Sequence, residues 1–392
     1  MSEKKIQILG ETARFDVCGY TRPVESVYHL NSFIYPAVGG KGRIYRLFKV
    51  LLSNFCRANC FYCINRQDRD CPRYRFDPDE LAGLFFSLWK KGYVDGLFLS
   101  SSIDGDASET QERMNKTVEI LRKRYNYSGY IHLKVLPGVD EVLIKRAFRL
   151  ASRLSLNMEA PGTKFLRKLS PDKDFSHLLL KNLKRISIIH NEHPLPAGIT
   201  SQLIVGAAGE SDRDITGFVF HLYNTLNLKR VYYSGFEPVI KTPMENLPSC
   251  PPLRELRLYQ ADILIRQYGF SPSELVFDTR GNLLPDRDPK LVWAENNPQK
   301  FPVEINRASM EELVRVPGIG YTGAQKILLR RQERRINSPD ELKGIRIRIS
   351  LASNFLTFNG KHFKGKISAE SSDDEKNMIK EEQEPLQVLW KE

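Results

Sequence analysis

Three cysteines within eight residues constrain this chain more than any other feature of its sequence. Cys56, Cys60 and Cys63 have the spacing C-x3-C-x2-C, and an aromatic residue, Tyr62, stands immediately before the last of them. Three thiolates this close together can bind three corners of one cubane iron–sulfur cluster and leave its fourth iron without a protein ligand. The segment must then fold as a tight loop, and the spacing predicts a metal centre with an open coordination site.

Structural zinc is the alternative for the same loop. Zinc usually takes four protein ligands, most often from two separate C-x2-C pairs, and this chain has no second pair. The other cysteines, Cys18, Cys71 and Cys250, are isolated from one another. Because Cys71 is near enough in sequence to supply a fourth ligand, the spacing alone leaves both metals open.

Strand-like and helix-like stretches alternate from residue 44 to about residue 290, and the first strand-like run leads directly into the cysteines. Strands are predicted at 44–52, 96–100, 130–135, 154–159, 200–205 and 229–233, and helices at 76–91, 109–125, 140–151, 174–185 and 212–226. Repeated alternation of this kind predicts a parallel sheet with helical crossovers. We therefore expect an α/β fold, a partial (β/α)6 barrel, whose functional groups gather at the carboxyl ends of its strands.

A glycine turn stands between two predicted helices near the end of the chain. The first helix, within 306–316, has Ser309 as its cap and Glu312 at the capping-box position. The turn Val316–Gly320 follows, and residues 321–331 predict the second helix. Two glycines allow the backbone to approach a phosphodiester closely, and the second helix presents free N–H groups and its positive dipole end to the phosphate.

This segment resembles the helix-hairpin-helix motif, also through Ala324 and Ile327, and basic side chains follow the turn. The predicted nucleic-acid contacts are Gly318, Ile319, Gly320, Lys326, Arg330 and Arg331. The basic side chains would attract a phosphate backbone without reading sequence. A weaker copy follows at 337–346, where we expect Gly344 to support packing more than phosphate contact. A helical hairpin that docks a protein or braces the fold is the alternative.

The cysteine loop, together with the β/α pattern, resembles the signature of radical S-adenosylmethionine (SAM) enzymes. The resemblance implies a 4Fe–4S cluster on Cys56, Cys60 and Cys63 whose free iron chelates the amino and carboxylate groups of SAM. It further implies that reductive cleavage of the sulfonium yields a 5′-deoxyadenosyl radical. An external electron donor such as flavodoxin or ferredoxin is then expected as a partner.

By the same resemblance, the segment after the second strand should hold the methionyl ammonium of SAM. Many members of the superfamily have Gly-Gly-Glu there, whereas this chain has Ser101 and Ser102 at the glycine positions and Asp104 or Asp106 as a possible source of charge. A Ser/Asp turn of this kind also suits the N-terminus of a helix. Ser101, Ser102 and Asp104 are the SAM-binding candidates of this segment.

The later strand ends supply candidates for the ribose and adenine of SAM. Asn157 and Glu159, at the fourth strand end, stand where similar proteins bind the ribose hydroxyls, and a carboxylate can accept two hydrogen bonds from a diol. Tyr62 and Gly206 are the adenine candidates, since small residues such as glycine allow close approach of the backbone to a purine. A structural ion pair is the alternative role for Glu159.

A radical SAM barrel followed by a helix-hairpin-helix module resembles a prokaryotic family described as DNA modification or repair radical SAM proteins, over roughly residues 45–358. The resemblance implies radical chemistry on DNA, and a base buried in a duplex would have to be extruded first. The formal net charge of +12 is compatible with any polyanion. A radical SAM enzyme acting on RNA or tRNA, or a non-catalytic zinc-stabilised nucleic-acid-binding protein, is the alternative.

Four parts are expected along the 392 residues. They are a lead-in at 1–43, the radical SAM partial barrel at 44–290, a small all-α helix-hairpin-helix module at 291–360 and a disordered polar tail at 361–392. No apolar run approaches the roughly 18 residues that span a bilayer. Because the N-terminus also lacks the apolar region of a signal peptide, we expect a cytoplasmic protein.

Overall fold

The computed structural model describes residues 3–16, 33–38 and 44–363. Cys18, part of the expected lead-in and residues 364–392 of the expected tail lie outside the described residues. Two compact units are present: the first holds the described residues up to Glu210 together with His221–Pro251, and the second holds Ser211–Phe220 with the described residues from Pro252 onward. Within these ranges, no helix has both the length and the apolar character needed to cross a membrane.

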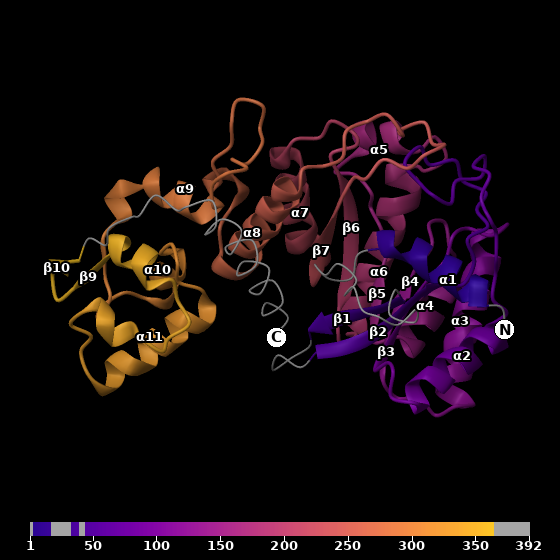
Figure 1. The fold of residues 1–392 in the computed structure, drawn as a ribbon, viewed down its shortest axis with the longest axis horizontal. Helices are drawn as coiled ribbons and strands as arrows, with labels where there is room; N and C mark the ends of the chain where they lie inside the picture. The colour runs from indigo at the N-terminus through magenta and orange to yellow at the C-terminus, as the bar shows by residue number, and fades with distance from the viewer. Residues whose placement is uncertain (1–2, 17–32, 39–43, 364–392) are drawn as a thin grey trace. The chain divides into compact units, whose positions relative to one another are not determined.

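The first unit is built on a seven-stranded sheet in which the strands stand in sequence order (Figure 1). The strands are β1 (Ile34–Val38), β2 (Ile44–Leu51), β3 (Gly96–Ser100), β4 (Tyr130–Lys134), β5 (Arg153–Ser155), β6 (Ile199–Val205) and β7 (Arg230–Gly235). β1 is antiparallel to β2, and β2 to β7 run parallel to one another. These six parallel strands confirm the predicted α/β fold and partial (β/α)6 barrel.

Crossover helices connect the parallel strands, and neighbouring helices pack on one another. α2 contacts α3, α3 contacts α4, and α4 contacts α6. When strands follow one another in sequence order and every crossover is right-handed, all crossover helices lie on the same face of the sheet. The other face is then left for the barrel interior. The helices are α2 (Pro78–Lys90), α3 (Ala107–Lys123), α4 (Glu141–Leu150), α5 (Thr163–Leu169), η4 (Phe175–Leu180), α6 (Lys181–Glu192) and α7 (Asp212–Leu226).

The N-terminal helix α1 (Glu3–Thr12) and the short turn η1 (Ala13–Phe15) pack against β2. Side chains of two strands reach the backbone of this stretch: Lys49 Nζ lies 3.4 Å from the Arg14 carbonyl oxygen, and Gln202 Nε2 lies 3.0 Å from that of Phe15. Strands β3 and β6 are buried at every position, as parallel strands are when both faces are covered. The N-terminal stretch thus contributes to the covering of the sheet.

The second unit combines short helices with a three-stranded sheet ordered β10-β9-β8. Its core consists of buried aliphatic residues and Phe358, among them Leu313, Ile319 and Ile327. A capping box between Ser309 and Glu312 starts α10, as predicted. The elements are α8 (Pro252–Tyr268), η5 (Pro272–Glu274), α9 (Pro289–Glu295), η6 (Pro298–Lys300), β8 (Val303–Glu304), α10 (Met310–Arg315), α11 (Tyr321–Glu333), η7 (Pro339–Leu342), α12 (Ile349–Ala352), η8 (Ser353–Phe355), β9 (Leu356–Phe358) and β10 (Lys361–His362).

The expectation that the C-terminal module is all-α was wrong in one detail, because a three-stranded sheet forms from β8, before α10, and from β9 and β10, after α12. Asn359 and Gly360 join β9 to β10 with φ angles of 51° and 76°, the left-handed backbone of a two-residue hairpin turn. An Asn-Gly pair beside a short apolar and aromatic run is a sequence signal for such a hairpin. β10 falls in the segment expected to begin the tail, and the second unit already includes α8 and α9.

Candidate functional site

A cavity of about 180 Å³ lies in the first unit, where the parallel strands end. Every parallel strand contributes to its wall, either from its last residues or from the loop that follows it. The contributing segments include Leu51 and 56–65 after β2, Ser100–Ile103 after β3, Lys134–Pro137 after β4, Asn157 and Glu159 after β5, Gln202 and Ile204 of β6, and Ser234–Glu237 at the end of β7. This is the edge at which parallel barrels carry their functional groups.

All three cysteines of the predicted metal loop line this cavity, and all three are free thiols. The Cys56 sulfur accepts a hydrogen bond from the Ala58 N–H at 3.4 Å, and the Cys63 sulfur accepts one from the Asn65 N–H at 3.4 Å. Burial raises the pKa of the Cys63 thiol, and the neighbouring Cys60 and Cys56 raise it further. The sulfurs are therefore close enough to interact, and backbone donors are in place to stabilise thiolates.

The donor set can be compared with the two metals that the spacing left open. The Cys71 sulfur lies 3.8 Å from the Ile64 carbonyl oxygen, and neither Cys71 nor Cys250 belongs to the cavity lining. Among the described residues, no three His, Cys, Asp or Glu side chains are grouped to hold a single metal ion. A tetrahedral zinc needs sulfurs roughly 3.8 Å apart, whereas each thiolate of a cubane cluster binds a different iron. Within the part of the chain that the structure describes, the three loop thiols therefore have no fourth cysteine beside them on the cavity wall.

A buried ion pair adjoins the thiols. Lys173 Nζ lies 2.7 Å from Glu159 Oε1, and the two side chains are only 12% and 8% exposed. Burial alone would lower the pKa of Lys173, but the neighbouring Cys60 thiol and Glu159 carboxylate raise it above its ordinary value. Burial, followed by the Glu159 charge, raises the pKa of Tyr62 well above its usual range. Tyr62, Glu159 and Lys173 thus form one group beside the cysteines.

Glu159 has an unusual backbone, with a φ of 65° at a non-glycine residue. Such a conformation costs about 1–3 kcal/mol and persists only where the surroundings hold it. Here the Glu159 N–H donates to the Gln202 carbonyl at 3.0 Å, and the Glu159 carbonyl accepts from the Ile204 N–H at 2.8 Å. Two main-chain hydrogen bonds to β6 therefore fix the Glu159 backbone and hold its carboxylate at the cavity. The carboxylate also makes an ion pair, which the sequence had indicated as an alternative role for Glu159.

A second polar group on the cavity wall includes residues that sequence reasoning missed. Lys134 Nζ lies 3.1 Å from Asp16 Oδ1, and the Ser100 hydroxyl donates to Asp16 Oδ2 at 2.6 Å. Lys134 also donates to the Asn157 amide oxygen, while the Asn157 amide group donates to Asp16 at 3.4 Å. Burial raises the pKa of Asp16, but Lys134, the Ser100 hydroxyl and Lys49 together lower it by more, so the net shift is downward and the carboxyl is ionised at neutral pH.

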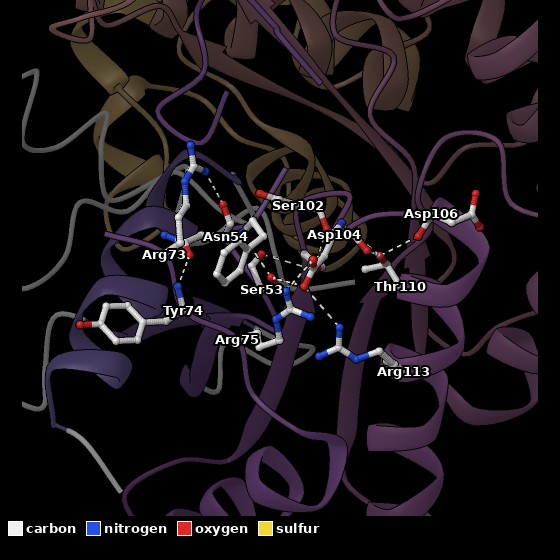
Figure 2. Close-up of polar contacts among 12 residues, drawn as sticks. Ser53, Asn54, Arg73, Tyr74, Arg75, Ser102, Asp104, Asp106, Thr110 and Arg113 are labelled. Carbon is white, nitrogen blue, oxygen red and sulfur yellow. Dashed lines mark hydrogen bonds and ion pairs between the residues drawn. The ribbon is translucent and has the colours of Figure 1, made fainter. Parts of the chain in front are cut away.

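Asp104 does not reach the cavity lining, although Ser101 and Ser102 do. Figure 2 shows its carboxylate among structural partners: the Ser53 hydroxyl donates to it at 2.8 Å, and Arg75 and Arg113 pair with it at 3.2 and 3.3 Å. Asp106 caps α3 by accepting hydrogen bonds from the first N–H groups of the helix. The helix-start alternative therefore describes this turn better than a carboxylate for the SAM ammonium, because the nearby guanidinium groups engage the Asp104 charge.

Gly206 also lies outside the cavity lining. Its N–H group and that of Ala208 donate to the buried Glu210 carboxylate, which closes the turn after β6. A side-chain carbon at Gly206 would stand 3.1 Å from Cys250 Cβ, and its φ is 94°. The glycine is thus required for the turn and for packing on Cys250, which differs from the expected contact with adenine.

The predicted nucleic-acid residues of the second unit divide into two groups. Lys326 is exposed on α11. By contrast, Arg331 donates to the Ala308 and Ile305 carbonyls at 2.6 and 3.1 Å, and Arg330 donates to the Glu341 and Lys343 carbonyls. Ile319 is buried at 1% exposure. The two arginines therefore brace neighbouring backbone, which was not foreseen from their place after the glycine turn.

Gly318 and Gly320 also differ from each other. Gly318 has a φ of 85°, whereas Gly320, the residue before α11, has an extended backbone with a φ of −97°. The need for glycine conformation at this turn therefore rests on Gly318 alone.

Residues 299–347 match the family described as the helix-hairpin-helix motif. A protein of Methanocaldococcus jannaschii described as uncharacterized is 25% identical over 225 residues, which are 53% of this chain and 53% of the relative. The chain thus matches about half the length of this curated relative.

Several solved structures also resemble part of the chain. Methylornithine synthase (PylB) is 18% identical with a TM-score of 0.44, over 55% of this chain and 60% of that one. The radical S-adenosylmethionine methyltransferase TsrM from Kitasatospora setae, solved with cobalamin and a 4Fe–4S cluster, is 15% identical with a TM-score of 0.42, over 83% of this chain and 67% of that one.

Proposed function

We propose that the protein is a radical SAM enzyme that acts on a nucleic acid, with DNA as the preferred substrate. One observation carries the first part: Cys56, Cys60 and Cys63 line the same strand-end cavity as Tyr62, Asn157 and Glu159. Among the described cysteines, only these three do so. Three thiolates would leave one iron of a cubane cluster without a protein ligand, and SAM chelation requires such an open iron.

The chain's own residues then have separable roles. The three thiolates would hold a 4Fe–4S cluster, which with bound SAM supplies reductive cleavage of the sulfonium to a 5′-deoxyadenosyl radical. Glu159 would accept hydrogen bonds from the ribose hydroxyls, and Lys173, paired with this carboxylate at 2.7 Å, holds it in position. Tyr62 and the Ser101–Ser102 backbone complete the wall of the cavity. An external reductant such as flavodoxin or ferredoxin would supply the electron.

The nucleic-acid part of the proposal is supported by the helix-hairpin-helix match and by exposed cations such as Lys326, Arg335 and Arg346 in the second unit. Phosphate contacts of this kind give affinity without sequence preference. A base embedded in a duplex has to be extruded before a radical can reach it. A radical SAM enzyme that acts on RNA or tRNA is the closest alternative, because the same cations attract either backbone.

The deciding experiment is anaerobic purification followed by reductive SAM cleavage. We expect brown protein with about four iron and four sulfide per chain, which yields 5′-deoxyadenosine and methionine when dithionite is added. DNA duplexes with and without lesions, and structured RNA, are then compared for stimulation of this cleavage and for product formation. Colourless protein that contains zinc and leaves SAM intact would contradict the proposal and favour a zinc-stabilised binding protein.

A further inference from the structure

The second unit contains two turns with the same backbone conformation. In the first turn, 316–319, the Ile319 N–H donates to the Val316 carbonyl at 3.1 Å, and in the second turn, 342–345, the Ile345 N–H donates to the Leu342 carbonyl at 3.0 Å. The third residue of each turn is a glycine with left-handed backbone, at a φ of 85° for Gly318 and 83° for Gly344. The weaker sequence copy is therefore a structural repeat.

The protein's own chain packs against the first turn at Gly318, which is half-buried. A side-chain carbon at Gly318 would stand only 2.8 Å from the Arg348 carbonyl oxygen and 3.3 Å from the Ala352 nitrogen. The Gly318 carbonyl already accepts the Arg348 N–H at 2.9 Å, and the buried Lys290 ammonium donates to the Ile319 carbonyl at 2.6 Å. The close backbone approach that Gly318 permits is thus used inside the unit.

The second turn has open surroundings. No atom outside its immediate neighbours lies within 4 Å of a side-chain carbon placed at Gly344, and the glycine is exposed. Ile345, which is 6% exposed, anchors the turn in the core, and the Arg330 guanidinium donates to the Lys343 carbonyl at 3.4 Å. Ile345 and Arg330 therefore hold the second turn on the side of the core, while the backbone at Gly344 is exposed to solvent.

Cations flank this open backbone. Lys343 precedes Gly344 and is 75% exposed, and Arg346 follows and is exposed as well. Lys343 pairs with Asp340 at 2.7 Å, but both side chains are exposed, and such surface pairs contribute little. A phosphate can therefore compete for the lysine at small cost.

We propose that the second turn, with Lys343 and Arg346, is the surface that contacts a phosphodiester backbone, and that the first turn is its internal support. The inference rests on the proposed nucleic-acid function of the second unit. An exposed glycine turn lets a phosphodiester approach the main chain, and the two cations attract it without reading bases. This assignment reverses the sequence-based expectation, in which Gly318–Gly320 contacted phosphate and Gly344 supported packing.

The test compares two double variants of the full chain that remove the same charge. Lys343→Gln with Arg346→Gln neutralises the second turn, and Arg280→Gln with Lys361→Gln neutralises two exposed cations elsewhere in the unit to which no binding role is assigned. Fluorescence anisotropy on one DNA duplex across a salt series is the measurement. We expect the first variant to bind about 10-fold more weakly, with a salt dependence flattened by up to about two phosphate contacts. The second variant should remain close to wild type.

A backbone variant gives an independent readout. Asparagine tolerates left-handed backbone, so Gly344→Asn should fold while placing a side chain where the phosphate would approach. We expect it to weaken DNA binding and to leave the circular dichroism spectrum unchanged. Gly318→Ala, in contrast, should disturb the fold of the unit, because its side chain meets the Arg348 backbone.

The outcomes separate this inference from the function on which it rests. If wild-type protein binds neither the duplex nor an RNA hairpin of similar length, the nucleic-acid function itself fails. If wild type binds DNA but neutralisation of Lys343 and Arg346 has no more effect than the matched control, only the assignment of the second turn is overturned. The same selective loss on RNA alone would keep the surface and change its partner to RNA.

Discussion

The cysteine loop of the first unit and the glycine turn of the second are both short motifs, but their atoms are used differently. The three thiols face a cavity that a cofactor could enter. The first turn packs at Gly318 against the backbone of Arg348 and Ala352, whereas the second turn is open around Gly344. A motif defined by reactive side chains indicates where chemistry lies. A motif defined by glycines indicates only a backbone shape, which can serve packing as well as binding.

The largest effect should come from the cysteines. We expect alanine at Cys56, Cys60 or Cys63 to abolish the 4Fe–4S cluster, because each thiolate binds a different iron. Alanine at Cys71 or Cys250 should leave it intact, since neither side chain lines the cavity. Iron counts and electron paramagnetic resonance of the anaerobically reconstituted variants measure both. Loss of the cluster in the Cys71 variant would reveal a fourth ligand and would end the argument for an open iron.

Glu159→Ala should weaken SAM binding by about 30- to 150-fold, the effect of losing two hydrogen bonds at about 1–1.5 kcal/mol each. The cluster spectrum should not change, because the glutamate is no ligand. Glu159→Gly removes the same carboxylate but suits the φ of 65°, so it should be the more stable of the two variants by about 1 kcal/mol. Calorimetric titration and thermal unfolding provide the measurements. Unaltered SAM affinity in both would leave Glu159 as only the ion-pair partner of Lys173.

The fold and the cysteine site were accessible from sequence because both depend on local patterns. Alternating runs located all six parallel strands, and α7 begins and ends where its pattern predicted. The partners in the ion pairs were not accessible: Asp16 meets Lys134, and Lys173 meets Glu159, only when the chain folds, although an ion pair as such was the alternative for Glu159. The single available signal was a lysine such as Lys134 within an otherwise buried strand, which requires a partner.

Asp104 illustrates the opposite error. Its place after a parallel strand suited a cofactor contact, and only the folded chain brings Arg75 and Arg113 to its carboxylate. Sequence position selects candidates at a strand end, but it cannot say which carboxylate already has a partner. The same limit explains why Arg330 and Arg331 were taken for phosphate contacts, although both donate to backbone carbonyls.

Lys173 offers a test of how the first unit would tune the proposed metal centre. Its ammonium adjoins the cysteine thiols, so Lys173→Met should lower the midpoint potential of the cluster by tens of millivolts, the size of a charge interaction of about 1–2 kcal/mol near a protein surface. Lys168→Met is the matched control, because Lys168 donates to the Ala208 carbonyl and lies outside the cavity lining. A redox titration followed by electron paramagnetic resonance measures the shift. Equal potentials in the two variants would limit Lys173 to holding Glu159.

The smallest effect concerns Lys290, which supports the first turn. Its ammonium donates to the Val314 and Ile319 carbonyls, and burial lowers its pKa from 10.5 to about 7. Because the unfolded chain keeps its proton up to about pH 10.5, the unfolded state binds more protons than the folded state between pH 7 and 10.5. Stability contributed by this group should therefore rise with pH in that window, by about 1 kcal/mol between pH 7 and 8.

Native-state hydrogen exchange of the α10 and α11 amides, corrected for intrinsic rates, measures this change. The Lys290→Met variant cannot titrate there, so its protection should be independent of pH over the same interval. The contrast sharpens the comparison of the two turns, because the open second turn has no buried lysine among its contacts in the described residues. If wild type and variant show the same pH dependence, Lys290 is not the group that titrates between pH 7 and 8.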